Sequence, residues 1–132
     1  MKISILLPYK ENFSPDYPGA VSLFVYETTK ISKFKKIITI FGNTTFKSIF
    51  NLKYVNIILK KDLFSSQTKN YVNKFINLEK KRNSSIIEVH NRPSYIHILN
   101  SKLTSRVFTL YFHNDPLSMD GSKTIEQRKT LL

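Results

Sequence analysis

Residues 85–93 read Ser-Ile-Ile-Glu-Val-His-Asn-Arg-Pro, and this stretch decides the fold class. Ser85–Val89 is a short run of apolar and β-branched side chains, which is typical of a strand. The residues that follow favour a helix, because Pro93 suits a first helical turn and Asn91 can cap one. A strand that passes into a helix over a few residues is the unit from which α/β domains are built.

The same alternation of strand and helix continues in both directions along the chain. Strands are predicted at Lys2–Leu7, Lys36–Phe41, Tyr54–Leu59, Ser85–Val89 and Val107–Phe112. Helices are predicted from Gly19 onward, with Ala20, Leu23, Phe24 and Ile31 on one face, over Ser66–Arg82, from Pro93 onward, and over Ser122–Leu132 with Ser122 as its cap. Thr44–Lys53 fits either a short helix or a loop. This order predicts a three-layer, Rossmann-like α/β domain with a mostly parallel twisted sheet.

Size and composition narrow the class of protein. The 132 residues match one domain, residues 1–132, and with 41% hydrophobic and 23% charged residues the chain is neither disordered nor fibrous. The absence of cysteine excludes disulfides, thiolate metal sites and a cysteine nucleophile. The apolar start ends at Pro8, which is too short for a signal peptide or a membrane span. We therefore expect a cytoplasmic protein, with peripheral contact to the inner membrane as a further interpretation.

The net charge of +12 attracts phosphates and anionic lipid. Lysine supplies all but four of the 21 basic residues, and part of this excess fits the bias of an AT-rich coding sequence. A protein that recognises nucleic acid more often uses arginine, for bidentate contacts to bases and phosphates. Lys35–Lys36, Lys60–Lys61 and Lys80–Arg82 are interpreted as solvated faces, with membrane docking as the second interpretation. A stand-alone module that binds nucleic acid or another polyanion stays open as an alternative function.

Three segments whose residues suit ligand binding or catalysis follow predicted strands. Ligands of open α/β sheets bind outside the carboxyl ends of the strands. The segments there are Pro18-Gly19-Ala20, His90-Asn91-Arg92 and His113-Asn114-Asp115. Gly19 is either part of a phosphate cradle at a helix start or a glycine chosen for its backbone angles. A dinucleotide site and a P-loop are disfavoured, because the chain lacks G-x-G-x-x-G and a Walker lysine.

Histidine is the most informative residue type because the chain has only three. His97 lies inside a helical pattern and is interpreted as a surface or packing residue. His90 and His113 each follow a strand; either alone fits a structural role, and the pair favours function. A metal site built from His90, His113 and Asp115 is the competing hypothesis, although no dense ligand pattern supports it. Asp115 fits a group that orients a sugar hydroxyl equally well as an ordinary turn aspartate.

Several of these segments together resemble one family. Ile86–Pro93, Leu110–Leu117 and residues 121–132, with Gly-Ser, Glu-Gln-Arg and Leu-Leu in order, resemble the N-terminal domain of glycosyltransferase family four. These are retaining enzymes of the GT-B fold. Lys2–Pro8 and Pro18-Gly19-Ala20 resemble the family's first strand and glycine loop, with Ala20 where a second glycine is common. The resemblance spans nearly the whole chain and implies the N-terminal half of a GT-B fold.

The resemblance implies roles for particular residues. The N-terminal domain of such an enzyme mainly holds the acceptor, a glycan or a lipid-linked sugar, and the C-terminal domain holds the nucleotide sugar. Carried over by position, His113 lies beside the reacting sugar as the catalytic residue, and Gly19 with Ala20 approaches the donor diphosphate or the acceptor. The remaining substrate-binding positions are His90, Asn91, Arg92, Asn114 and Asp115. No metal or other cofactor is implied, because helix dipoles and basic side chains offset the charge of the leaving diphosphate.

The chain also departs from the family pattern. The donor-binding C-terminal domain is missing, and no two glutamates have the E-x7-E spacing. We therefore expect the chain to be inactive alone and to need that missing domain as a partner. Self-association through exposed apolar surface is a further expectation.

Overall fold

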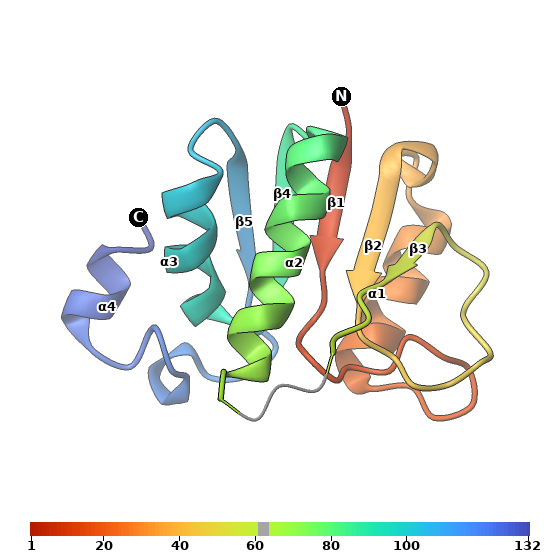
Figure 1. The fold of residues 1–132 in the computed structure, drawn as a ribbon, viewed down its shortest axis with the longest axis horizontal. Coiled ribbons are helices and arrows are strands. Elements are labelled where there is room, and N and C mark those ends of the chain that lie inside the picture. The colour runs from red at the N-terminus through yellow and green to blue at the C-terminus, as the bar shows by residue number, and fades with distance from the viewer. Residues whose placement is uncertain (61–63) are drawn as a thin grey trace.

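Five parallel strands form the centre of the structure, a computed structural model that describes residues 1–60 and 64–132 (Figure 1). They are β1 (Ile3–Leu6), β2 (Ile38–Gly42), β3 (Tyr54–Asn56), β4 (Ile86–His90) and β5 (Val107–Tyr111). Their order in the sheet is β3-β2-β1-β4-β5. The chain therefore switches direction across the sheet between β1 and β4, which is where ligands of such sheets bind. The predicted parallel, three-layer fold class is confirmed.

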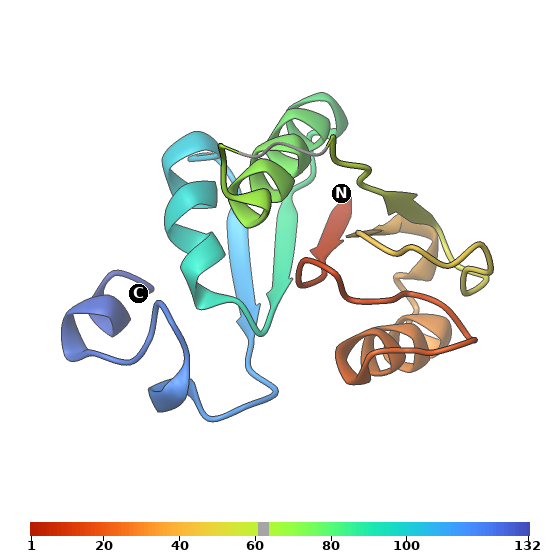
Figure 2. The same ribbon diagram turned by 60° about the horizontal axis from the view of Figure 1, so that its bottom comes forward.

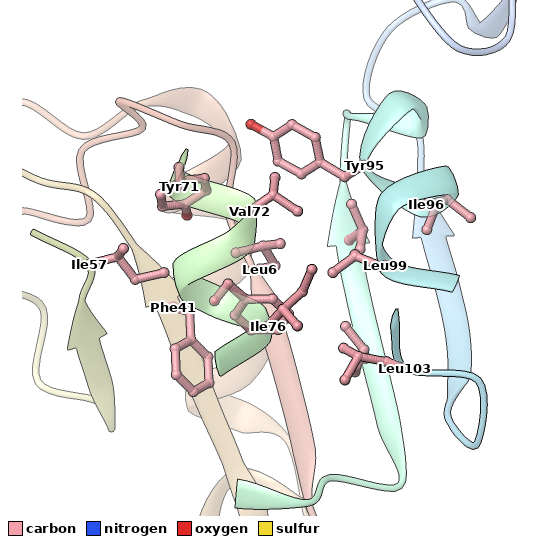
Figure 3. Packing of buried hydrophobic residues seen from close by; sticks show 13 residues of the cluster. Leu6, Phe41, Ile57, Tyr71, Val72, Ile76, Tyr95, Ile96, Leu99 and Leu103 are labelled. Atoms are coloured by element: carbon pink, nitrogen blue, oxygen red, sulfur yellow. The ribbon is translucent and has the colours of Figure 1, made fainter. Parts of the chain in front are cut away.

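Helices cover the sheet on both sides, but unequally (Figure 2). The helices are α1 (Ala20–Ile31), α2 (Gln67–Arg82), α3 (Pro93–Lys102) and α4 (Ile125–Lys129), with short 3₁₀ turns η1 (Lys35–Ile37) and η2 (Pro116–Ser118). α2 and α3 pack on one face and bury the larger core cluster, where their side chains meet those of the strands (Figure 3). α1 packs on the other face over β1 and β2. None of the helices in the described ranges is long and apolar enough to cross a membrane.

The inner and outer strands differ in how their two faces are covered. β1 is buried on both faces, since Leu6 belongs to the cluster under α2 and α3 while Ile5 belongs to the cluster under α1. In β5, Phe108 and Leu110 pack against the larger cluster, whereas Val107, Thr109 and Tyr111 are exposed. On that second face Phe24 of α1 contacts Tyr111, with ring centroids 5.1 Å apart, but leaves all three side chains exposed. The predicted self-association stays a prediction, and the exposed side chains of β5 form one surface available for it.

A buried polar cluster lies at the amino ends of β1 and β4. We call Ser4, Glu79, Arg82 and Ser84 the amino-edge cluster. The Glu79 carboxylate is fully buried; it accepts hydrogen bonds from the Ser4 hydroxyl at 2.6 Å and from the Ser84 backbone N–H at 2.6 Å. Arg82 donates to the Ser4 hydroxyl and to two backbone carbonyls. Every acceptor oxygen of this carboxylate is thus used to join the end of α2 to the sheet.

The packing face predicted for α1 was wrong. Its buried side chains include Val21, Val25 and Thr29, which follow each other at four-residue spacing and form one helical stripe. Leu23 and Ile31 are exposed instead. The sequence contains two overlapping apolar stripes on this helix, and contact with the sheet selects the one made of β-branched residues.

Two predicted helix caps were also wrong. Asn91 does not cap α3, because its backbone takes the left-handed conformation at φ 54° and its side chain accepts from the backbone N–H of His113. Ser122 donates to the Pro116 carbonyl at 2.5 Å, and α4 begins later, after a capping box between Thr124 and Gln127.

The chain between β2 and α2 is less regular than predicted. Residues 44–53 contain no helix, so the loop interpretation of this segment holds. β3 ends at Asn56 rather than at Leu59, because its partner β2 ends at Gly42 and offers no further backbone to pair with. Lys61, part of the predicted Lys60–Lys61 face, lies outside the described residues.

Candidate functional site

Glu88, His90 and His113 meet at the carboxyl edge of the sheet, and we call them the carboxyl-edge cluster. Successive side chains of a strand point to opposite faces, so Glu88 and His90 share the face of β4 that α2 and α3 do not cover. His90 is paired in register with Tyr111 of β5. His113 lies two residues beyond Tyr111, and the fold thereby places its ring next to His90.

Two short contacts connect the cluster. His90 Nε2 is 2.5 Å from Glu88 Oε1, and His90 Nδ1 is 2.9 Å from His113 Nε2. A carboxylate only accepts hydrogen bonds, so Nε2 of His90 carries a proton and donates it. The His90 side chain is 1% exposed and that of Glu88 30%. A positive charge on the buried His90 ring would therefore lie directly beside the Glu88 carboxylate, which offsets the cost of removing that charge from water. His113 is half-buried and is the outermost of the three hydrogen-bonded side chains.

Aromatic rings enclose the two histidines. His90 stacks on Tyr111 with ring centroids 5.4 Å apart, and Phe24 of α1 meets the His113 ring edge-on at 4.9 Å. This contact explains why Phe24 is half-buried although it lies outside the main packing stripe of α1. The rings restrict both imidazoles to one orientation, so their mutual hydrogen bond is preorganised.

The environment lowers the pKa of His113 from its ordinary value of 6.5. Partial burial is the largest cause, and the adjacent His90 adds to it. The carboxylates of Glu11 and Glu88 act in the opposite direction and raise this pKa. The net result favours a neutral His113 at neutral pH, which is the form that can accept a proton.

The start of α1 is occupied by a side chain of the protein. Glu11 Oε1 accepts from the backbone N–H of Ser22 at 2.9 Å, in the first turn of the helix. A Cβ on Gly19 would lie 1.8 Å from the same carboxylate oxygen. Gly19 has φ −68°, which any residue adopts, so what disfavours a side chain here is the Glu11 carboxylate and not the backbone conformation. The phosphate role of Gly19 and Ala20 stays a prediction, with Glu11 now the observed acceptor at that helix end.

The other sequence-predicted residues divide into two groups. Asn91 and Arg92 line a pocket of about 330 Å³ between the start of α3 and the segment after β5. Asn91 also holds the backbone of His113, with Oδ1 3.3 Å from its N–H. Asn114 is exposed, and Asp115 Oδ1 caps the turn η2 by accepting from Leu117 N–H at 2.9 Å. Asp115 therefore makes the contact that is expected of an ordinary turn aspartate.

A larger cleft of about 750 Å³ was missed by the sequence reasoning. It lies at the carboxyl ends of β1, β2 and β3. Most of the residues that line it carry neutral polar groups, although apolar atoms make up most of the surface that they expose: Tyr9, Lys10, Asn12, Asn43, Thr44, Thr45, Asn56, Ile58, Leu59 and Gln67. In the described part of the chain, Asn12 Nδ2 and Asn43 Oδ1 have no hydrogen-bond partner, so both can meet a ligand. The signal was present as Asn43-Thr44-Thr45 directly after a strand, a position where ligand-binding side chains concentrate.

The loop after β1 connects this cleft with the carboxyl-edge cluster. Asn12 lines the cleft, while the neighbouring Glu11 is close enough to act on the pKa of His113. Lys10 in the same loop has φ 65°, an uncommon conformation for a residue with a side chain. With Asn91 at φ 54°, left-handed backbone therefore occurs beyond both β1 and β4, the two strands at the switch point.

Among the described residues, no group of three or more His, Cys, Asp or Glu side chains is arranged to hold a metal ion. Comparison with known proteins found no matching protein family, no matching curated protein and no matching solved structure. The fold and the site define the chain as a Rossmann-like α/β domain with an ionisable cluster and a polar cleft at its carboxyl edge.

Proposed function

We propose that this chain is the acceptor-side domain of a nucleotide-sugar-dependent glycosyltransferase, with His113 beside the reacting sugar. The observation that carries the proposal is the 2.9 Å contact between the rings of His90 and His113 at the carboxyl edge of the sheet. His113 Nδ1 has no partner in the described residues and is not a buried unpaired atom, so it faces solvent. An imidazole held in this way can donate to a sugar hydroxyl or a leaving phosphate.

The polar cleft supplies the place for the acceptor. Amide and hydroxyl groups, such as those of Asn12, Asn43 and Thr45, match the many hydroxyls of a sugar without requiring charge. Tyr9 adds an aromatic surface for the apolar face of a sugar ring. The substrate class is therefore a glycan or lipid-linked sugar as acceptor, and a nucleotide sugar as donor.

Sugar transfer also needs groups that bind the donor. We propose that a second, nucleotide-sugar-binding domain contributes them, as the resemblance to glycosyltransferase family four implies. Helix dipoles and basic side chains then offset the charge of the leaving diphosphate, and no residue of the present chain has to hold a metal ion. The protein group that acts on the acceptor in this arrangement is His113.

The proposal is tested by binding and turnover on the same protein. NMR of the isolated chain with short glycans should shift the amide signals of Asn12, Asn43 and Thr45, and Asn43→Ala should weaken the binding. Asn77→Ala, an exposed amide on α2, is the matched control. Transfer should appear only when the chain is joined to a nucleotide-sugar-binding domain. Transfer by the 132-residue chain alone, or glycan contacts far from this cleft, contradicts the proposal.

A second candidate function, binding of a polyanion, has its own observation. The loops and helix ends at the amino edge of the sheet (Figure 1) carry a series of basic residues: Lys2, Lys33, Lys35, Lys36, Lys80, Lys81, Arg82, Lys102 and Arg106. The only acidic residue adjoining these described segments is Glu79, which is buried. The resulting field attracts nucleic acid or anionic lipid.

Salt dependence separates this candidate from the first. Oligonucleotide binding through many lysines should weaken steeply between 50 and 200 mM salt, by about 10³-fold if six phosphates are contacted. Lys35→Glu with Lys36→Glu should abolish it, and His113→Ala should leave it unchanged. Tight binding of this kind with no glycan binding favours the polyanion function over the glycosyltransferase.

A further inference from the structure

We propose that Glu88 is a positioning residue: it holds His90 so that His90 Nδ1 accepts from His113 Nε2–H, and it draws that shared proton onto His90 when the outer nitrogen of His113 takes a proton from a substrate. Glu88 does not touch the proposed substrate position itself and acts through His90. Its relevance to sugar transfer rests on the function proposed above. Its effect on the histidine pair does not depend on that function.

The hydrogen-bond geometry fixes most of the proton positions. Because an ionised Glu88 carboxylate only accepts, we assign the proton of their 2.5 Å contact to His90 Nε2. The 2.9 Å contact between His90 Nδ1 and His113 Nε2 then holds a single proton, carried by one nitrogen or the other. Two doubly protonated rings cannot share this contact, because neither would offer an acceptor.

Proton uptake by the pair is balanced as a short relay. In the neutral pair, His113 Nε2–H donates to His90 Nδ1, and His113 Nδ1 presents a lone pair. When His113 Nδ1 takes a proton, its Nε2–H bond breaks and a new N–H bond forms at His90 Nδ1. The positive charge ends on His90 beside Glu88, while His113 is again neutral and now donates from Nδ1. The outer nitrogen can therefore act first as a base and then as an acid.

The charges around the pair favour transfer of the shared proton from His113 to His90. The groups that face His113 are Glu88 and His90 on β4, Tyr111 on β5 and Glu11 in the loop after β1. Of the two carboxylates, Glu88 forms a short contact with His90, whereas Glu11 is engaged with the α1 backbone. An imidazolium on His90 is thus directly paired, which offsets the cost of burying it.

The test uses the 132-residue chain and requires no sugar transfer. The ring nitrogens of His90 and His113 are followed by NMR as the pH is lowered, in the wild type and in Glu88→Gln. The glutamine carbonyl can still accept from His90 Nε2–H, so the change removes the charge and keeps the contact. Glu126→Gln, which removes an exposed charge on α4, is the matched control.

In the wild type we expect the first added proton to appear as an imidazolium on His90. In Glu88→Gln the proton affinity of the pair should fall about 10- to 100-fold, a shift of about one to two pH units, and the charge should move to His113. Glu88→Asp keeps the negative charge close by and should restore part of the shift. Glu126→Gln should titrate like the wild type.

Two results would overturn the proposal. One is a Glu88→Gln variant that titrates like Glu126→Gln. The other is a wild type in which His113 carries the first charge while His90 stays neutral; this measurement decides the matter even if Glu88→Gln fails to fold. Glycan binding and transfer are measured separately, so failure of the proposed function is distinguishable from failure of the relay.

Discussion

The two ends of the sheet each hold a polar cluster built around one carboxylate, and the clusters differ in how they end. At the amino edge, Glu79 is fully buried and both of its oxygens accept from groups of the protein. At the carboxyl edge, Glu88 is partly exposed, and its contacts lead through His90 to a nitrogen of His113 that faces solvent. A closed cluster serves the fold, whereas an open one keeps a group available for a ligand.

The largest expected effect is on turnover at the open cluster. In a protein that joins this domain to a donor-binding domain, His113→Ala should lower turnover by roughly 10²–10⁴, the usual worth of a positioned polar group. Its free energy of unfolding should change by less than about 1 kcal/mol, because this half-buried side chain is not part of the core. Turnover assays and chemical denaturation on the same samples check this. A variant that melts several degrees lower while its folded fraction keeps full activity would show that His113 is structural.

The closed cluster should respond in the opposite way. Glu79→Ala leaves the Ser4 hydroxyl and the Ser84 backbone N–H buried without their acceptor, which should cost about 3 kcal/mol of unfolding free energy. Glycan binding by the fraction that stays folded should be unchanged. Urea denaturation measures the loss, with Glu126→Ala as an exposed control. A cost below that of Glu88→Ala would erase the distinction between the two ends.

A smaller effect tests how the carboxyl edge is built. Gly19→Ala should cost about 1–2 kcal/mol, because the new Cβ displaces the Glu11 carboxylate from the first turn of α1. In a Glu11→Ala background the same change should cost much less, and this coupling is measured by a double-mutant cycle. Additive effects would mean that Gly19 is required for another reason, and the phosphate role would then regain support.

The smallest expected effect is on the pH dependence of stability. The pKa of His113 is lowered in the folded chain, so below pH 6.5 the unfolded chain binds a proton more readily there. The stabilising contribution is therefore complete above pH 6.5 and is lost as the pH falls through 6.5 toward the folded pKa. Denaturation at several pH values should show a weaker decline in His113→Gln than in the wild type. An equal decline in both proteins contradicts the lowered pKa.

Local patterns in the sequence were sufficient for the fold class and for most elements. The apolar runs predicted where the strands lie, and the helix predicted over Ser66–Arg82 is observed as α2. The same patterns failed on α1 and at the helix caps near Asn91 and Ser122. In those places two local solutions were available, and contacts with distant segments selected between them.

By itself, the sequence determined that strands alternate with helices and that His90 and His113 each follow a strand. Hydrophobic periodicity and strand ends are properties of neighbouring residues, so they can be read along the chain. Only the tertiary structure decided that Glu88 contacts His90, that Glu11 caps α1 beside Gly19, and that polar residues after three strands form one cleft. These contacts depend on strand order and register, which bring together residues that no local pattern connects.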